Sequence, residues 1–142
     1  MTKYCIVVLT ALSAGLAATA GQTVSLQNQT LRAEWDAASG ALVSLKDRGS
    51  GREWLDPAVA APLYTITLAN AERTISSAQA ASVRIKPGIG TLVIECVHTD
   101  LTVTCEYRLD PASPCVLGRI AVRADTPVRL AEVRFPLVAL KL

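Results

Sequence analysis

Apolar and polar residues alternate along most of the chain after about residue 20, with the period of two that is typical of β-strands with one buried face. Residues 31–36, LRAEWD, place Leu31, Ala33 and Trp35 on one face and charged side chains on the other. Because such a strand buries its apolar face, we predict that Trp35 lies in the core.

A turn and a second alternating segment follow. The segment DAASG contains turn-forming residues, and Gly40 can adopt a positive φ without steric cost. In residues 41–47, ALVSLKD, the alternation resumes and predicts that Ala41, Val43 and Leu45 point inward. Together the two segments predict a β-hairpin with a connection of about four or five residues.

The same periodicity continues toward the end of the chain. Residues 71–81, AERTISSAQAA, carry a weaker pattern that fits either a short strand or a helical turn. The other predicted strands fall at residues 63–70, 82–87, 91–98, 101–109, 115–125 and 127–140. Roughly nine strands with few helices, separated by turns at this spacing, are typical of all-β sandwiches. We therefore predict an all-β fold, an antiparallel β-sandwich.

The register of one predicted hairpin follows from its apolar faces. A slip of one residue would turn every apolar side chain outward, so the numbers of paired residues must have an odd sum. With the turn at residues 99–100, Cys96 opposes Val103 and Cys105 opposes Ile94. The two cysteines are then diagonal neighbours, whose backbones lie at the long limit for a disulfide.

The first twenty residues have the pattern of a secretory signal peptide. Lys3 provides a positive charge, an apolar run follows, and ATA at residues 18–20 is a small-x-small cleavage site. The apolar run is too short and too rich in small residues to favour a transmembrane span. We therefore expect residues 1–20 to be a signal peptide, residues 21–142 to form one mature β-sandwich domain, and the protein to be exported, to the periplasm or the medium.

The charge balance of the mature chain argues against polyanionic partners. The full sequence has 14 basic and 12 acidic residues, and removal of Lys3 leaves thirteen basic side chains. These are scattered rather than clustered, so we expect neither nucleic acid nor, after signal cleavage, a membrane as partner.

Three cysteines remain in the mature chain, Cys96, Cys105 and Cys115. At most one disulfide can form among them, and buried thiols that act as small apolar side chains are an equal alternative. The sequence has no C-x-x-C spacing and His98 is its sole histidine, so it predicts no metal site. Nothing in it points to a cofactor.

The sequence also predicts no catalytic site. It contains no glycine-rich phosphate loop, no nucleophile elbow and no histidine-containing triad with supporting partners. Glu95 and Glu106, with Arg108 beside them, fall on the polar face of a hairpin and indicate a solvated charged surface. His98 falls at the hairpin tip, where we expect no side chain to orient it as a general base.

Carbohydrate binding would require an exposed aromatic side chain on which a sugar ring can stack. Trp35 is expected in the core, and Tyr64 and Tyr107 follow the strand alternation and indicate core or rim positions. Trp54 follows a glycine-rich turn and is the candidate substrate-binding residue. The alternative is that Trp54 packs beneath a loop, as most tryptophans are largely buried.

Residues 31–55, LRAEWDAASGALVSLKDRGSGREWL, resemble the start of the galactose-mutarotase-like β-sandwich that precedes the catalytic barrel in several families of secreted glycoside hydrolases. DLTVTCEYRLD is similar to the second half of such domains, and LAEVRFPLVAL to the strand that closes the sandwich. The resemblance covers about residues 24–142 and rests on packing and turn residues, so it implies a fold more than an activity.

The resemblance implies a role as well as a fold. In those families the catalytic acid and nucleophile belong mainly to the barrel, which this chain lacks, so no catalytic residue is transferred. The chain stops on an apolar segment, FPLVALKL, which leads us to expect a larger protein. The leading hypothesis is a non-catalytic N-terminal domain of a secreted glycoside hydrolase, with a downstream catalytic domain as partner and carbohydrate as the substrate of the whole enzyme. The alternative is a stand-alone β-sandwich module that binds carbohydrate or a cell surface.

Overall fold

The computed structural model describes residues 21–56, 58–69, 72–111 and 114–140. The predicted signal peptide, residues 1–20, lies outside the described residues. Within the described ranges, no helix is long and apolar enough to cross a membrane.

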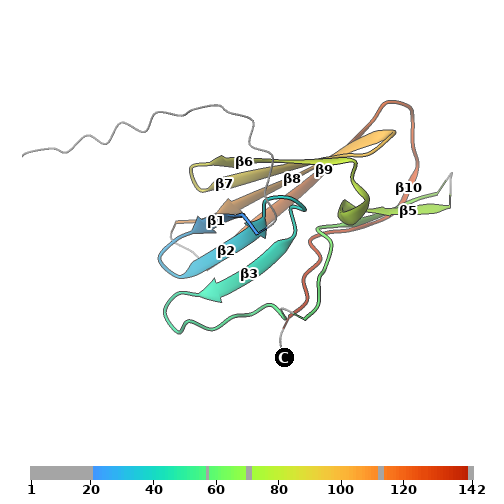
Figure 1. Ribbon diagram of the computed structural model, residues 1–142. Coiled ribbons are helices and arrows are strands. Elements are labelled where there is room, and N and C mark those ends of the chain that lie inside the picture. The colour runs from blue at the N-terminus through green and yellow to red at the C-terminus, as the bar shows by residue number, and fades with distance from the viewer. Residues whose placement is uncertain (1–20, 57, 70–71, 112–113, 141–142) are drawn as a thin grey trace, which may run out of the picture.

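Three antiparallel sheets make up the structure (Figure 1). The first contains β1 (Thr23–Gln27), β2 (Leu31–Asp36) and β3 (Leu42–Asp47), in that order. The second has β4 (Thr65–Leu68) at its centre, between β10 (Leu130–Arg134) and β5 (Arg73–Ser76). The third contains β6 (Ser82–Gly88), β7 (Thr91–Val97), β8 (Leu101–Leu109) and β9 (Val116–Ala124), in that order. The predicted all-β class is confirmed.

The first and third sheets face each other with the core between them, as in a β-sandwich (Figure 1). Alternate residues of β7 and β8 are buried, which is the period of two that the sequence shows. Trp35 is fully buried, as predicted. The largest fully buried side chains are Trp35, Tyr64, Ile66, Leu92, Ile94, Val103, Cys96 and Cys105.

The register predicted for the β7–β8 hairpin is confirmed. Cys96 pairs with Val103 and Ile94 with Cys105, so the two cysteines are diagonal neighbours. Both are buried as free thiols, and Cys115 is a free, exposed thiol. Of the two alternatives left open by the sequence, the structure therefore contains the buried thiols.

One predicted strand face is wrong. A β-bulge shifts the pairing of β2 and β3, so that Glu34 pairs with Ser44 but Trp35 pairs with Leu42. Val43 is the extra residue, and 44% of its surface is exposed, whereas Leu42 packs against the core. A bulge interrupts the strict alternation on which the prediction rested, because two residues then oppose one.

Other differences concern the limits of elements. β1 was not predicted, although its Leu26 is buried against the core. The ambiguous segment 71–81 contains both expected elements, since β5 is followed by a 3-10 helix, Ser77–Gln79. The last predicted strand, 127–140, is a strand only over Leu130–Arg134.

The segment after β10 returns to the sandwich and closes one end of the core. The Phe135 ring lies 5.7 Å from that of Tyr107, which lies 5.0 Å from that of Trp35 (centroid distances). Gly118 on β9 faces the Phe135 ring. A Cβ atom on residue 118 would lie 3.1 Å from that ring. Further along, the backbone N–H of Leu137 donates to the carbonyl of Leu63.

Candidate functional site

Trp54 lies beside the edge of the first sheet. Its backbone N–H donates to the carbonyl oxygen of Leu45 on β3, at 2.9 Å, so the segment after the glycine-rich turn extends that sheet. The indole is half-buried, and the guanidinium carbon of Arg52 lies 4.2 Å from the ring centroid. Arg52 therefore covers one face of the ring through a cation–π contact, which leaves less aromatic surface on which a sugar could stack.

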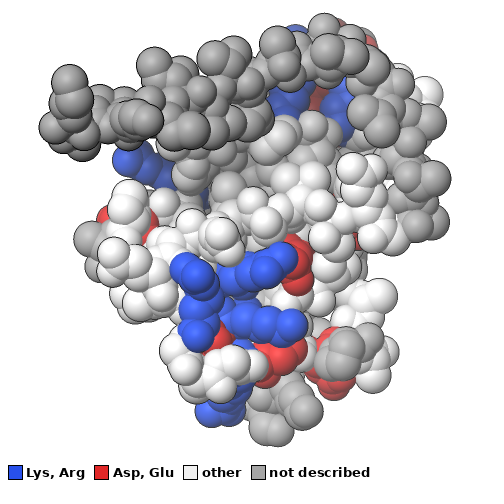
Figure 2. Space-filling model, turned by 60° about the vertical axis from the view of Figure 1, so that its left-hand side comes forward, with Lys and Arg blue, Asp and Glu red and all other residues white. Residues whose placement is uncertain are grey.

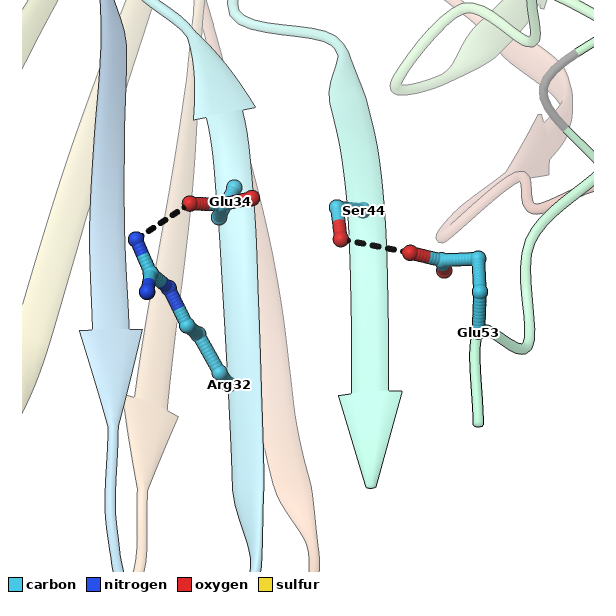
Figure 3. A network of polar contacts seen from close by, with 4 residues as sticks. All are labelled: Arg32, Glu34, Ser44 and Glu53. Atoms are coloured by element: carbon cyan, nitrogen blue, oxygen red, sulfur yellow. Dashed lines mark hydrogen bonds and ion pairs between the residues drawn. The ribbon is translucent and has the colours of Figure 1, made fainter. Parts of the chain in front are cut away.

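The neighbouring Glu53 fixes this segment to β3, as Figure 3 shows. Its carboxylate accepts hydrogen bonds from the Ser44 hydroxyl at 2.6 Å and from the backbone N–H groups of Leu45 and Leu55, at 2.8 and 3.0 Å. Partial burial opposes ionisation, but these hydrogen bonds outweigh it and hold the pKa of Glu53 below its ordinary value. Glu53 is thus an ionised structural residue, and no sequence pattern marks it as one.

A second group of polar residues surrounds His98, at the end of the β7–β8 hairpin. We expected no side chain to orient this histidine, and that expectation is wrong. Its Nε2 atom lies 2.7 Å from the hydroxyl of Tyr64, which directly precedes β4, and only 9% of the His98 surface is exposed. The two residues are 34 positions apart, so their contact exists only because the second and third sheets meet here.

Burial sets the protonation of this pair. It lowers the pKa of His98, with opposing effects from Asp100, which raises it, and Arg73, which lowers it. Burial also raises the pKa of Tyr64 far above its ordinary value. At neutral pH both groups are therefore uncharged. The Tyr64 hydroxyl can then donate to Nε2, which leaves the imidazole proton on Nδ1.

His98 lines a groove with a volume of about 270 Å³ between β5, the 3-10 helix and the β7–β8 turn. An ion pair spans these elements: Nη2 of Arg73 lies 3.0 and 2.8 Å from the two carboxylate oxygens of Asp100. On the 3-10 helix, the side-chain oxygen of Gln79 accepts the backbone N–H of Ser76, which fixes the amide orientation. The groove is lined by Arg73, Thr74, Ile75, Gln79, Ala81, His98, Thr99 and Asp100.

An apolar hollow of about 160 Å³ lies between β3, residues 55–56 and 59–61, and residues 137–139. Leu42 and Leu55 line it, and the exposed side chains of Val43, Val59 and Val138 surround them. Leu140, which pairs with Leu55 through an isolated β-bridge, is 54% exposed. We call Val43, Val59, Val138 and Leu140 the valine-rich surface.

The charged residues of the β7–β8 hairpin lie as predicted. Glu95 and Glu106 are on the outer face of the third sheet, and Arg84 on β6 forms an ion pair with Glu95 at 3.3 Å. On the face in Figure 2, several basic side chains lie side by side, with acidic side chains at the edge of the group. Exposed pairs of this kind contribute little to stability.

No group of three or more His, Cys, Asp or Glu side chains in the described residues could hold a metal ion. The predicted site residue, Trp54, and the His98 groove lie on different sheets and do not form one site. A buried His–Tyr pair leaves no signal in strand periodicity, so only the presence of a single histidine beside a turn could have drawn attention to the groove.

Comparison of the sequence with models of known protein families and with curated proteins gave no match. The class of this protein is therefore defined by its structure, an antiparallel β-sandwich.

Proposed function

We propose that the chain is a non-catalytic β-sandwich domain of an exported carbohydrate-active enzyme, a glycoside hydrolase, in which it supports a catalytic domain. The observation that carries this proposal is the valine-rich surface. The resemblance of residues 31–55 to galactose-mutarotase-like domains supplies the enzyme class. Export follows from the signal-peptide pattern of residues 1–20.

The valine-rich surface has the character of an interdomain contact. Val43, Val59 and Val138 line a common apolar hollow, and Leu140 pairs with Leu55, which also lines it. Each of the four exposes 42% or more of its surface. Contiguous exposed apolar surface commonly marks a site of protein interaction, and interfaces between domains of one chain are of this kind. Because Leu140 belongs to this surface, a domain connected after residue 142 would begin close to it.

The first test is the intact mass of the native secreted protein, read together with the codons that follow Leu142. We expect an N-terminus at Gly21 and a product several times larger than this chain. A product that ends at Leu142 would overturn the proposal. A second test assays the isolated mature chain on a panel of glycosides and polysaccharides, where we expect no hydrolysis and where robust turnover would also overturn the proposal.

Substitutions in the full-length product test the surface itself. We expect Val138→Glu or Val59→Glu to accelerate proteolytic release of the sandwich, because a buried carboxylate would oppose domain contact. Ile89→Glu is the matched control, since Ile89 is fully exposed at the β6–β7 turn. Equal release in all three variants would show that the valine-rich surface is not the contact.

A second candidate function is a stand-alone module that binds carbohydrate or a cell surface. It is favoured by one observation, the partial exposure of Trp54. It predicts that the mature chain is retained on a polysaccharide affinity gel and that Trp54→Ala abolishes retention, whereas Ile89→Ala does not. Absence of retention on all gels would exclude this role for Trp54.

A further inference from the structure

We propose that the groove beside His98 binds one neutral sugar unit of a glycan. The inference rests on the proposed function in that carbohydrate is taken as the ligand class. The groove lies away from Trp54, so it is a binding site that aromatic stacking would not have revealed.

The charge of the groove points to a neutral ligand. Of the residues that line it, only Arg73 and Asp100 carry formal charges at neutral pH, and these cancel within one ion pair. His98 is uncharged because burial lowers its pKa. A phosphate or carboxylate would find no uncompensated positive charge here, and a metal ion would find too few ligands.

The hydrogen-bonding groups match the hydroxyls of a sugar. A hydroxyl both donates and accepts, and the Arg73–Asp100 pair presents donors beside acceptors. Gln79 keeps its amide nitrogen as a donor, because its oxygen already accepts the N–H of Ser76. The buried partner Tyr64 fixes the ring of His98. Such prior orientation lowers the entropic cost of binding.

Size and apolar lining fit a single ring. The volume of about 270 Å³ is just below the range of roughly 300–1,000 Å³ that is common for drug-sized ligands. Ile75 and Ala81 add apolar contacts, which suit the C–H groups of a sugar. With few contacts and an open groove, we expect dissociation constants on the order of millimolar.

His98 provides a single-residue reporter, because it is the only histidine in the sequence. The test follows its imidazole ¹H–¹⁵N signals in a protein of residues 21–142 at pH 7.5. The probes are D-galactose, D-glucose and D-mannose, with D-glucuronate and inorganic phosphate as anionic comparisons, each at up to about 100 mM to detect millimolar binding. We expect a saturable shift with at least one neutral hexose and none with the anions.

Variants show whether the groove is responsible. Asp100→Asn and Arg73→Gln should each weaken hexose binding by about tenfold or more, because each removes a charge-assisted partner. Glu95→Gln breaks the comparable exposed pair with Arg84 on the third sheet and should leave binding unchanged. Both groove substitutions are at exposed side chains, and backbone NMR spectra verify that the variants fold.

Two results would overturn the inference: no saturable shift with any neutral hexose, or a stronger shift with phosphate or glucuronate. Neither depends on the catalytic domain. If the native product ends at Leu142 and a hexose binds, the proposed function fails while the groove assignment holds. If the product is a larger glycosidase and no hexose binds, the groove assignment alone fails.

Discussion

The hydroxyl of Tyr64 and the Nε2 atom of His98 are 2.7 Å apart in the interior, where the sheet of β4 meets the end of the β7–β8 hairpin. This contact holds two sheets together and turns an apparent hairpin-tip histidine into a buried, neutral one. It therefore links the stability of the fold to the protonation of a single imidazole.

The first prediction concerns pH. The pKa of His98 in the folded protein lies below its unfolded value of about 6.5. At a pH between these two pKa values, the unfolded chain therefore binds more protons than the folded chain. The contribution of neutral His98 to the free energy of unfolding is therefore complete above about pH 6.5, and it is lost as the pH falls toward the pKa of His98 in the folded protein. Urea denaturation between pH 8 and pH 5 should show a falling free energy of unfolding.

Carboxyl groups titrate mainly below this window, and the groups that face His98 are Tyr64, Asp100 and Arg73. The control is His98→Asn, in which the slope between pH 8 and pH 5 should disappear. An unchanged slope in this variant would assign the pH dependence to another group.

The second prediction is that Glu53→Gln destabilises the protein by about 1–2 kcal/mol at pH 7, since hydrogen bonds to a charged acceptor are replaced by weaker ones. Because the folded pKa of Glu53 is depressed, its contribution is present above the unfolded value of about 4.3 and is lost as the pH falls through the folded pKa. Denaturation at pH 7 and at pH 3 measures both effects.

Glu132→Gln is the matched control for Glu53, because Glu132 pairs with Arg134 on an exposed strand. We expect it to change the stability little at either pH. Equal effects of the two substitutions would contradict the structural role of Glu53.

The third prediction concerns Gly118. In Gly118→Ala the new methyl group would press on the Phe135 ring, at 3.1 and 3.2 Å from two of its carbon atoms. We expect a loss of about 1 kcal/mol from this overpacking. In a Phe135→Leu background the same substitution should be neutral or stabilising, since alanine is favoured over glycine in a strand by about 0.5–1 kcal/mol. Additive effects in the double-mutant cycle would show that the two residues do not interact.

The fourth prediction concerns the thiols of Cys96, Cys105 and Cys115. Cys115 is exposed, whereas Cys96 and Cys105 are buried, and burial raises the pKa of Cys105 to about 12. A thiol reagent should therefore modify Cys115 rapidly in the native protein and the other two only after unfolding. Cys115→Ser should remove the rapid reaction. Fewer than three reactive thiols in the denatured, unreduced chain would reveal a disulfide.

The sequence by itself determined most of the strands and the pairing of the β7–β8 hairpin. Alternation with a period of two is a property of neighbouring residues, so it located β2 and β8 and set the register of the β7–β8 hairpin, in which Ile94 pairs with Cys105. It also placed Trp35 in the core, because the apolar face of a strand is buried away from water.

Only the tertiary structure decided the contacts between separate elements of the chain. The bulge that exposes Val43, the carboxylate of Glu53 on β3 and the approach of Phe135 to Gly118 each require elements to be packed together. His98 is the clearest case: its partner Tyr64 is 34 residues away. Periodicity carries no information about such a pair, because the pair forms through the packing of two sheets and its energy comes from the exclusion of water between them.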